Sequence, residues 1–249
     1  MKEKLSYLNL LDLCILTVIF FGTAIYGSTI EIFSYYFSPE SIADNHSIQF
    51  SDYQNISALI FQLVLLSIAI AYLKWRNFDF TQLHFSFSIR SIFMAILLFI
   101  LIAIMMDIYF YIIQYIDYWI YYEDYQQDSL TTLITENNED FSSDNTSFIS
   151  LWLVLYSLLN GFYEEIFFLG LCLCVKPDYQ KWAFLFSLLI RFSFHTYQGI
   201  ESALGITLVL GVTFYLLFKR STNKNLVPFA LAHSLGDVFG VGILAYFYY

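Results

Sequence analysis

Long apolar stretches separated by short polar ones dominate the chain. Four of these stretches exceed the ~20 residues that a helix needs to cross hydrocarbon, and the second, fifth and sixth lie between that length and the lower limit of about 17. They are apolar on all sides, as expected in lipid. The pattern predicts an all-α, polytopic membrane protein with about seven transmembrane helices in one bundle. The segments are residues 9–30, 56–73, 91–116, 148–175, 181–199, 202–218 and 226–248.

Composition agrees with this class and excludes others. The 249 residues are 59% hydrophobic and only 13% charged, which excludes an ordinary soluble domain. The length suits a single multi-pass domain over residues 1–249, in contact with membrane lipids. The three cysteines lie in apolar segments, so we expect packing or lipid-facing thiols and no disulfide framework. There is no basic patch, so nucleic acid is not an expected partner.

The basic residues lie before the first predicted crossing and then in every second link between crossings. Ten of the eleven Lys and Arg residues fall on one side of the membrane if all seven segments cross. The positive-inside rule then predicts a cytoplasmic N-terminus and an external C-terminus. Asp12, near a helix end, is expected to reach the interface. The ten residues are Lys2, Lys4, Lys74, Arg76, Arg90, Lys176, Lys181, Lys219, Arg220 and Lys224.

Two adjacent carboxylates, Glu164 and Glu165, interrupt the fourth apolar segment. A charged side chain at bilayer depth costs on the order of 2.5 kcal/mol or more on insertion scales, so such groups face a protein interior and mark functional sites. Later segments carry His195 with Arg191, and His233 with Asp237. Members of each pair are four residues apart and share a helix face. These groups form a predicted site for catalysis or transport.

The residue types suit hydrolysis. Peptide cleavage in a bilayer requires a water, a base and donors for the oxyanion. A glutamate beside an imidazole can be the base, and a second imidazole can hold the oxyanion or the water. A divalent metal such as zinc, held by two histidines and a carboxylate, is the alternative. Asn160 shares a face with Glu164, and Gly161 allows a neighbouring helix to approach closely.

Arg191 is the eleventh basic residue and the one that falls inside a segment. Because an unpaired arginine in hydrocarbon is unfavourable, we expect a carboxylate partner, either Glu165 or Glu164. The alternatives are backbone carbonyl groups or Asp107.

At these residues the sequence resembles the CPBP family of intramembrane proteases, also called Abi, which includes the type II CAAX prenyl endopeptidases. The resemblance covers about residues 148–240. The family motif EExxxR corresponds to Glu164-Glu165 with Leu169 in place of the arginine. The second motif, FxxxH, corresponds to Arg191-Phe192-Ser193-Phe194-His195. Thr196-Tyr197-Gln198-Gly199 follows, so the stretch is similar to the RxxxHxYQG form of many bacterial members. The third motif, HxxxN or HxxxD, corresponds to His233 and Asp237.

The resemblance implies roles for these residues. Glu164 would activate the water with His195 as its partner, and His233 and Asp237 would hold the oxyanion or the water. An ionised aspartate cannot donate a hydrogen bond, so Asp237 is either protonated, or orients His233, or binds a metal. The metal question stays open: either no cofactor is used, or a divalent metal binds among Glu164, His195, His233 and Asp237.

The sequence therefore predicts an endopeptidase in a bacterial plasma membrane that cleaves membrane-anchored or hydrophobic peptides. Bacteriocin processing and self-immunity are among the roles that the family suggests. A non-proteolytic scaffold or immunity protein is the first alternative, motivated by the missing arginine at Leu169. A proton-coupled transporter that uses Glu164, Glu165 and His195 as a relay is the second.

Overall fold

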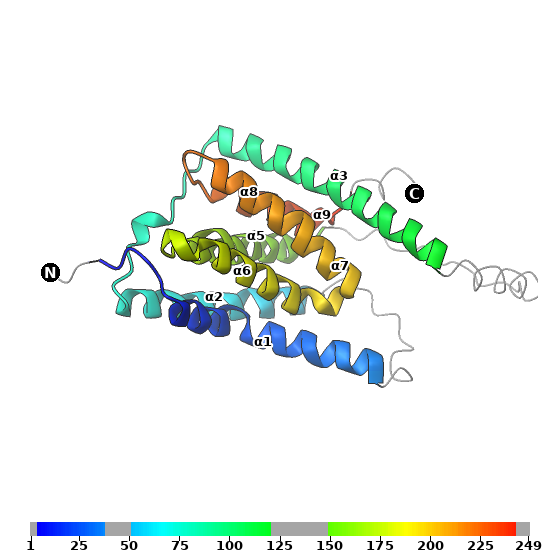
Figure 1. Cartoon of the computed structure of the whole chain (residues 1–249), viewed down its shortest axis with the longest axis horizontal. Coiled ribbons are helices and arrows are strands. Elements are labelled where there is room, and N and C mark those ends of the chain that lie inside the picture. Colours follow the sequence, from blue (N-terminus) through cyan, green and yellow to red (C-terminus); the bar gives the residue numbers. More distant parts are fainter. Residues whose placement is uncertain (1–3, 38–50, 121–148, 243–249) are drawn as a thin grey trace, which may run out of the picture.

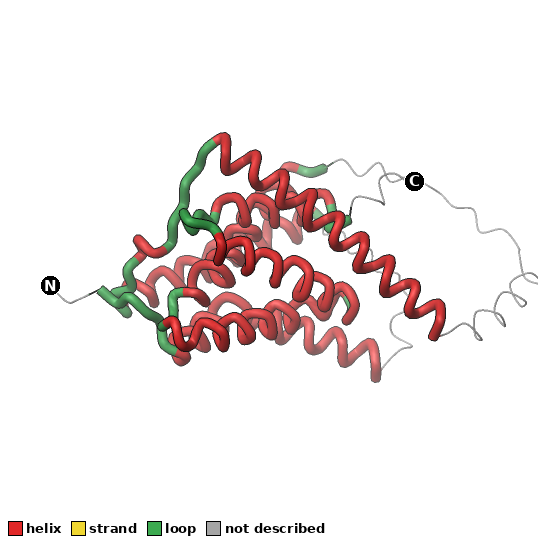
Figure 2. Tube along the Cα trace, turned by 45° about the horizontal axis from the view of Figure 1, so that its top comes forward, coloured by secondary structure: helices red, strands yellow, loops and turns green. Residues whose placement is uncertain are grey.

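The computed structural model describes residues 4–37, 51–120 and 149–242, and within these ranges every regular element is a helix. The helices run side by side as one bundle (Figures 1 and 2). They are α1 (Leu10–Phe37), α2 (Asp52–Trp75), α3 (Ile89–Ile120), α5 (Leu151–Glu165), α6 (Gln180–His195), α7 (Ile200–Gly205), α8 (Val212–Arg220) and α9 (Val227–Phe239). Short 3-10 turns lie at Phe80–Gln82, Leu171–Leu173, Pro177–Tyr179 and Thr196–Gln198.

Two π-helical segments extend the shorter helices. Ile166–Gly170 continues α5 toward the turn at Leu171–Leu173, and Ile206–Gly211 joins α7 to α8. Four helical stretches are long and apolar enough to cross a membrane: Leu10–Ser34, Asp52–Trp75, Ile89–Ile120 and Ile200–Arg220. The predicted all-α polytopic membrane bundle is therefore confirmed.

The seventh predicted segment is wrong in its length. Within the described residues, α9 has 13 residues and ends at Phe239, although the prediction ran to residue 248. The helix stops because Gly240 adopts a φ of 84°, which favours glycine. At ~1.5 Å per residue, α9 is about 20 Å long, less than the ~30 Å of a hydrocarbon core. Residues 243–248 of that prediction lie outside the described part, and so does the predicted external C-terminus.

Among the described residues, the Lys and Arg side chains other than Arg191 lie at or near the links between helices at one end of the bundle, on the left in Figure 1. Isolated backbone bridges join Leu5 with Phe78, Leu8 with Val175, and His84 with Asn225. These bridges tie the start of the chain to the α2–α3 and α5–α6 links, and the α2–α3 link to the α8–α9 link. The alternating crossings of the charge pattern are consistent with this arrangement. That this end faces the cytoplasm stays a prediction.

The expected interfacial position of Asp12 is wrong. Its side chain is buried, with 2% of the residue exposed. One carboxylate oxygen accepts hydrogen bonds from Arg76 Nε at 2.6 Å and from the Tyr72 hydroxyl at 2.7 Å. A charged side chain near a helix end extends toward water when the protein offers it no partner. Here Tyr72 of α2 and Arg76, directly after that helix, are the partners of Asp12. The network joins α1 to α2 at the basic end of the bundle.

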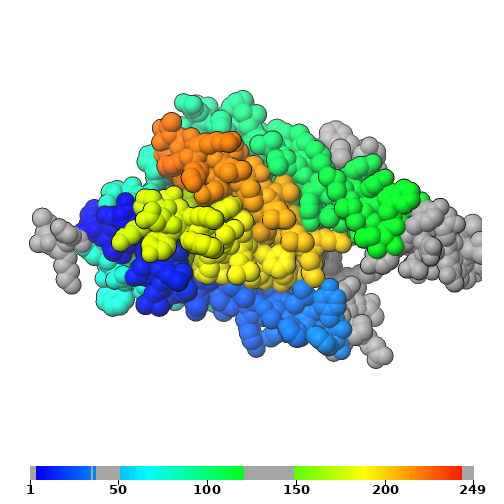
Figure 3. Space-filling model, in the orientation of Figure 1, coloured from blue at the N-terminus to red at the C-terminus, as the bar shows by residue number. Residues whose placement is uncertain are grey.

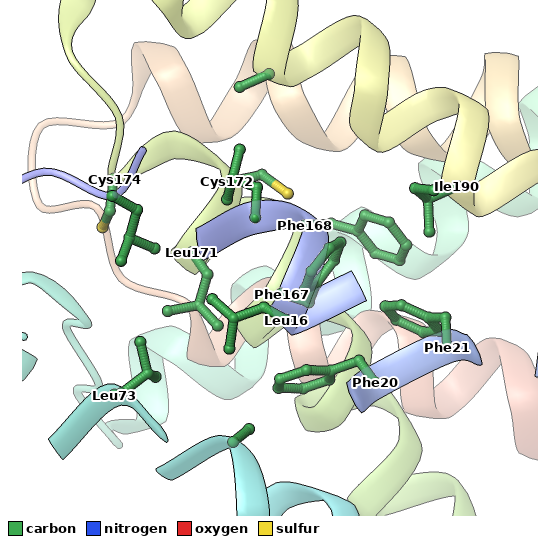
Figure 4. Packing of buried hydrophobic residues seen from close by; sticks show 14 of the residues in the cluster. Leu16, Phe20, Phe21, Leu73, Phe167, Phe168, Leu171, Cys172, Cys174 and Ile190 are labelled. Carbon is green, nitrogen blue, oxygen red and sulfur yellow. The ribbon is translucent and has the colours of Figure 1, made fainter. Parts of the chain in front are cut away.

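An aromatic cluster fills the space between α1, α6 and the end of α5. Phe20 and Phe21 of α1 meet Phe167 and Phe168 of the π-helical segment Ile166–Gly170 (Figure 4). The ring centroids of Phe21 and Phe194 of α6 are 4.6 Å apart. The outer surfaces of α1, α6 and α8 cover one face of the molecule (Figure 3). The cluster packs directly beside the polar residues described below.

Close packing at Gly161 brings α5 against α9. A Cβ at this position would overlap the Ala230 carbonyl oxygen and the Ser234 hydroxyl. The Ser234 hydroxyl donates to that same carbonyl at 2.8 Å, so it has little freedom to move. The predicted close approach at Gly161 is confirmed, and α9 is the helix that uses it.

We expect Gly161→Ala to lower the free energy of unfolding by about 1–3 kcal/mol, because overpacking forces the two helices apart. Gly27→Ala is the matched control, since no atom lies within 4 Å of a Cβ there. That change should be neutral or stabilising by up to about 1 kcal/mol. Thermal unfolding of both purified variants in detergent measures the difference. Equal unfolding temperatures would contradict the role assigned to Gly161.

Candidate active site

Glu164 and Glu165 are the last two residues of α5. Adjacent helix residues point about 100° apart, so the two carboxylates have different surroundings. Here α6 and α9 each supply partners, and both carboxylates are buried: Glu164 is 3% exposed and Glu165 0%. The π-helical turn Ile166–Gly170 follows directly. Such turns are frequent at functional sites.

Glu165 lies at the centre of the cluster, between Arg191 and His233. Its Oε1 accepts a hydrogen bond from Arg191 Nη2 at 2.8 Å and lies 2.8 Å from His233 Nδ1. The Arg191 guanidinium stacks over the ring of Phe168, with Cζ 4.1 Å from the ring centroid. The prediction that Arg191 pairs with a carboxylate of this site is confirmed, and Asp107 is not that partner. The arginine thus joins α6 to α5 and His233 joins α9 to α5.

Glu164 is held differently. Its Oε1 accepts a hydrogen bond from Asn160 Nδ2 at 3.1 Å. Its Oε2 accepts no hydrogen bond from the described residues, although it is buried. This oxygen lies 3.7 Å from Arg191 Nη1 and 3.7 Å from His233 Nε2. Glu164 therefore keeps one oxygen available between two nitrogen atoms of the cluster.

His233 and Asp237 share one face of α9, as predicted. His233 Nε2 lies 3.7 Å from Asp237 Oδ1 as well as from Glu164. The other aspartate oxygen accepts a hydrogen bond from Asn160 Nδ2 at 2.9 Å. The Asp237 side chain is 26% exposed, unlike the two glutamates. It therefore lies at the more open edge of the cluster.

His195 does not make the predicted contact with Glu164. Its Nδ1 lies 2.7 Å from the carbonyl oxygen of Arg191, one turn earlier in α6. Because a carbonyl oxygen only accepts, Nδ1 carries the proton and Nε2 is left as an acceptor. In the part of the chain that the structure describes, no hydrogen bond or ion pair joins His195 to Glu164. The bond to its own helix holds the imidazole ring instead.

Gln62 belongs to this cluster, although the sequence did not predict it as a site residue. Its Nε2 donates a hydrogen bond of 2.6 Å to Asn160 Oδ1, and so connects α2 to the cluster. The sequence does carry a signal for this residue, since Gln62 is a polar amide inside the second apolar segment. Asn160, predicted as a supporting residue, lies between Gln62 and the carboxylates.

The described residues do not fit a metal ion in this arrangement. They contain no group of three or more His, Cys, Asp or Glu side chains placed to hold one. The free oxygen of Glu164 lies beside the guanidinium of Arg191, and a permanent cation there opposes a second cation. Cys172 and Cys174 are free, buried and part of the aromatic cluster.

Fold and site together define an integral membrane protein with a buried cluster of acidic, basic and amide side chains. Residues 146–239 match the family model described as type II CAAX prenyl endopeptidase Rce1-like. This match confirms the resemblance predicted from the motifs: residues 146–239 are similar to the type II CAAX prenyl endopeptidases. The match supports a general function as an intramembrane protease of the CAAX type. No curated protein and no solved structure matches the chain.

Proposed function

We propose that the protein is an endopeptidase that hydrolyses membrane-anchored or hydrophobic peptides, with Glu164 as the base that activates water. One observation carries this proposal. Glu164 Oε2 is buried, accepts no hydrogen bond from the described residues, and lies 3.7 Å from both Arg191 Nη1 and His233 Nε2. A base beside donors that face the same point is the arrangement that acyl transfer requires.

The chemical steps follow from these atoms. A water gives one proton to Glu164 as its oxygen bonds to the peptide carbonyl carbon. The carbonyl oxygen becomes an oxyanion, which the Arg191 Nη1–H group can stabilise, since Nη1 donates no hydrogen bond to the described residues. A doubly protonated His233 would present Nε2–H as a second donor. Glu164 then passes its proton to the leaving nitrogen as the carbon–nitrogen bond breaks.

The remaining residues have supporting roles in this proposal. Glu165, one of the predicted catalytic residues, is a positioning residue because its Oε1 already bonds both Arg191 and His233. The contacts of Asp237 favour the alternative in which it orients His233. His195 can accept a proton or a water hydrogen through Nε2.

The substrate class follows from the surroundings of the site. Glu164 lies among the helices of a membrane bundle, so a substrate must reach it from lipid or along a helix boundary. We propose a bacterial plasma membrane as the location, with peptide maturation, bacteriocin processing or self-immunity as the biological setting. The scaffold alternative loses its motivation, because Arg191 gives Glu165 the charged partner that Leu169 cannot.

The test offers a peptide panel to the purified protein in lipid nanodiscs. The panel contains hydrophobic peptides with and without an isoprenylated C-terminal cysteine, and mass spectrometry detects the products. We expect the wild-type protein to cleave at least one peptide and Glu164→Ala to cleave none. A chelator-treated sample, with its metal content measured, is expected to keep its activity. Equal cleavage by wild type and variant would reject the assignment, and activity lost with the metal and restored by zinc would favour a metalloprotease.

A further inference from the structure

An amide on α2 lies behind the carboxylates of the site. Gln62 belongs to α2, outside residues 146–239 that match the family model. Its Nε2 is 2.6 Å from Asn160 Oδ1. Asn160 Nδ2 in turn contacts Glu164 Oε1 at 3.1 Å and Asp237 Oδ2 at 2.9 Å. Three hydrogen bonds thus connect α2, α5 and α9.

The donor and acceptor types of these groups determine which way the amides of Asn160 and Gln62 are turned. Ionised carboxylates only accept, so Asn160 must turn its NH₂ group toward Glu164 and Asp237. Both N–H bonds of that group are then used, and Oδ1 faces the opposite way. Only a donor can satisfy Oδ1, so Gln62 must present its NH₂ group there. The carboxylates therefore set the orientation of the Asn160 amide, and Gln62 holds that amide from the opposite side.

We propose that Gln62 is a positioning residue, which holds Glu164 and Asp237 in their working orientations through Asn160. The inference rests on the proposed function of Glu164 as the base. Asn160 bonds the Oε1 atom of Glu164, and this bond determines where the reactive Oε2 atom points. Without the donor from α2, Asn160 Oδ1 loses its hydrogen bond, and the Asn160 side chain is no longer held against Glu164 and Asp237. Glu164 would then lose its one hydrogen bond from the described residues.

This role predicts a specific kinetic result. Gln62 contacts no reacting atom, so Gln62→Leu should lower kcat and leave KM within about twofold. We expect a fall in kcat of about 10- to 100-fold, the size of effect that a misplaced catalytic group produces. Gln62→Asn keeps an amide but is one methylene shorter, and should lower kcat similarly while preserving the fold. Ser67→Ala is the matched control on α2, because the Ser67 hydroxyl bonds only the Leu63 carbonyl of its own helix.

A double-mutant cycle with Asn160→Ala shows whether Gln62 acts through Asn160. The four proteins of the cycle, wild type included, are assayed for kcat and for thermal unfolding beside Glu164→Ala. We expect Gln62→Leu to have little further effect on either quantity once Asn160 is replaced. Additive effects on both quantities would overturn the inference, as would full activity of Gln62→Leu and Gln62→Asn. If wild type cleaves no peptide, the proposed function fails, while the unfolding cycle still measures the coupling.

Discussion

Glu164→Gln is expected to lower kcat/KM by at least about 100-fold, because a positioned general base contributes 10²–10⁴-fold. The variant should unfold close to the wild-type temperature. Glu164 Oε1 can still accept from Asn160 in the variant, and the Oε2 position holds no hydrogen bond from the described residues to lose. Activity and thermal unfolding are measured on the same preparation.

Glu165→Gln is the paired variant, and it should behave differently. Its Oε1 bonds both Arg191 and His233. Removing its charge leaves the buried arginine with only the more distant carboxylate of Glu164, at 3.7 Å, and breaking a buried pair is destabilising by about 3–5 kcal/mol. We therefore expect activity loss with stability loss for Glu165, and activity loss alone for Glu164. Loss of activity in the Glu165 variant, with Glu164→Gln still active, would reverse the assignment of the base.

Arg191→Leu is expected to abolish activity and also to destabilise the fold by about 3–5 kcal/mol, because it leaves Glu165 buried and less compensated. The variant also removes the Nη1 donor beside Glu164. Peptide cleavage and the unfolding temperature are the two measurements. Arg76→Leu is the matched control: it breaks the Arg76–Asp12 pair at the basic end of the bundle. That change should lower stability and leave kcat of the folded protein near the wild-type value.

The rescue variant adds Leu169→Arg to Arg191→Leu. Position 169 lies about one turn after Glu165, so a guanidinium there can reach the same carboxylate. Leu169 is 3% exposed and packs in an apolar cluster with Leu226 and Phe214, so crowding should keep the rescue partial. An active Arg191→Leu single variant would show that the site requires no arginine at this position.

Most of the helices could be predicted from periodicity and length alone. Crossing segments in lipid must be long, apolar and helical, because the backbone has no water to bond. The same reasoning predicted the pairing of Arg191, since a lone guanidinium in hydrocarbon is too unfavourable to persist. It failed for α9, where one glycine ends the helix, and for Asp12, whose partner lies on another helix.

The sequence by itself thus determined the class of protein, the helices and the residue types of the site. The tertiary structure decided which atoms meet: that Arg191 and His233 both bond Glu165, that Glu164 keeps a free oxygen, and that His195 bonds its own helix. It also brought Gln62 of α2 to the cluster. The physical reason is that periodicity describes one helix at a time. Contacts between helices depend on how each is rotated and how closely it packs, as α5 and α9 do at Gly161.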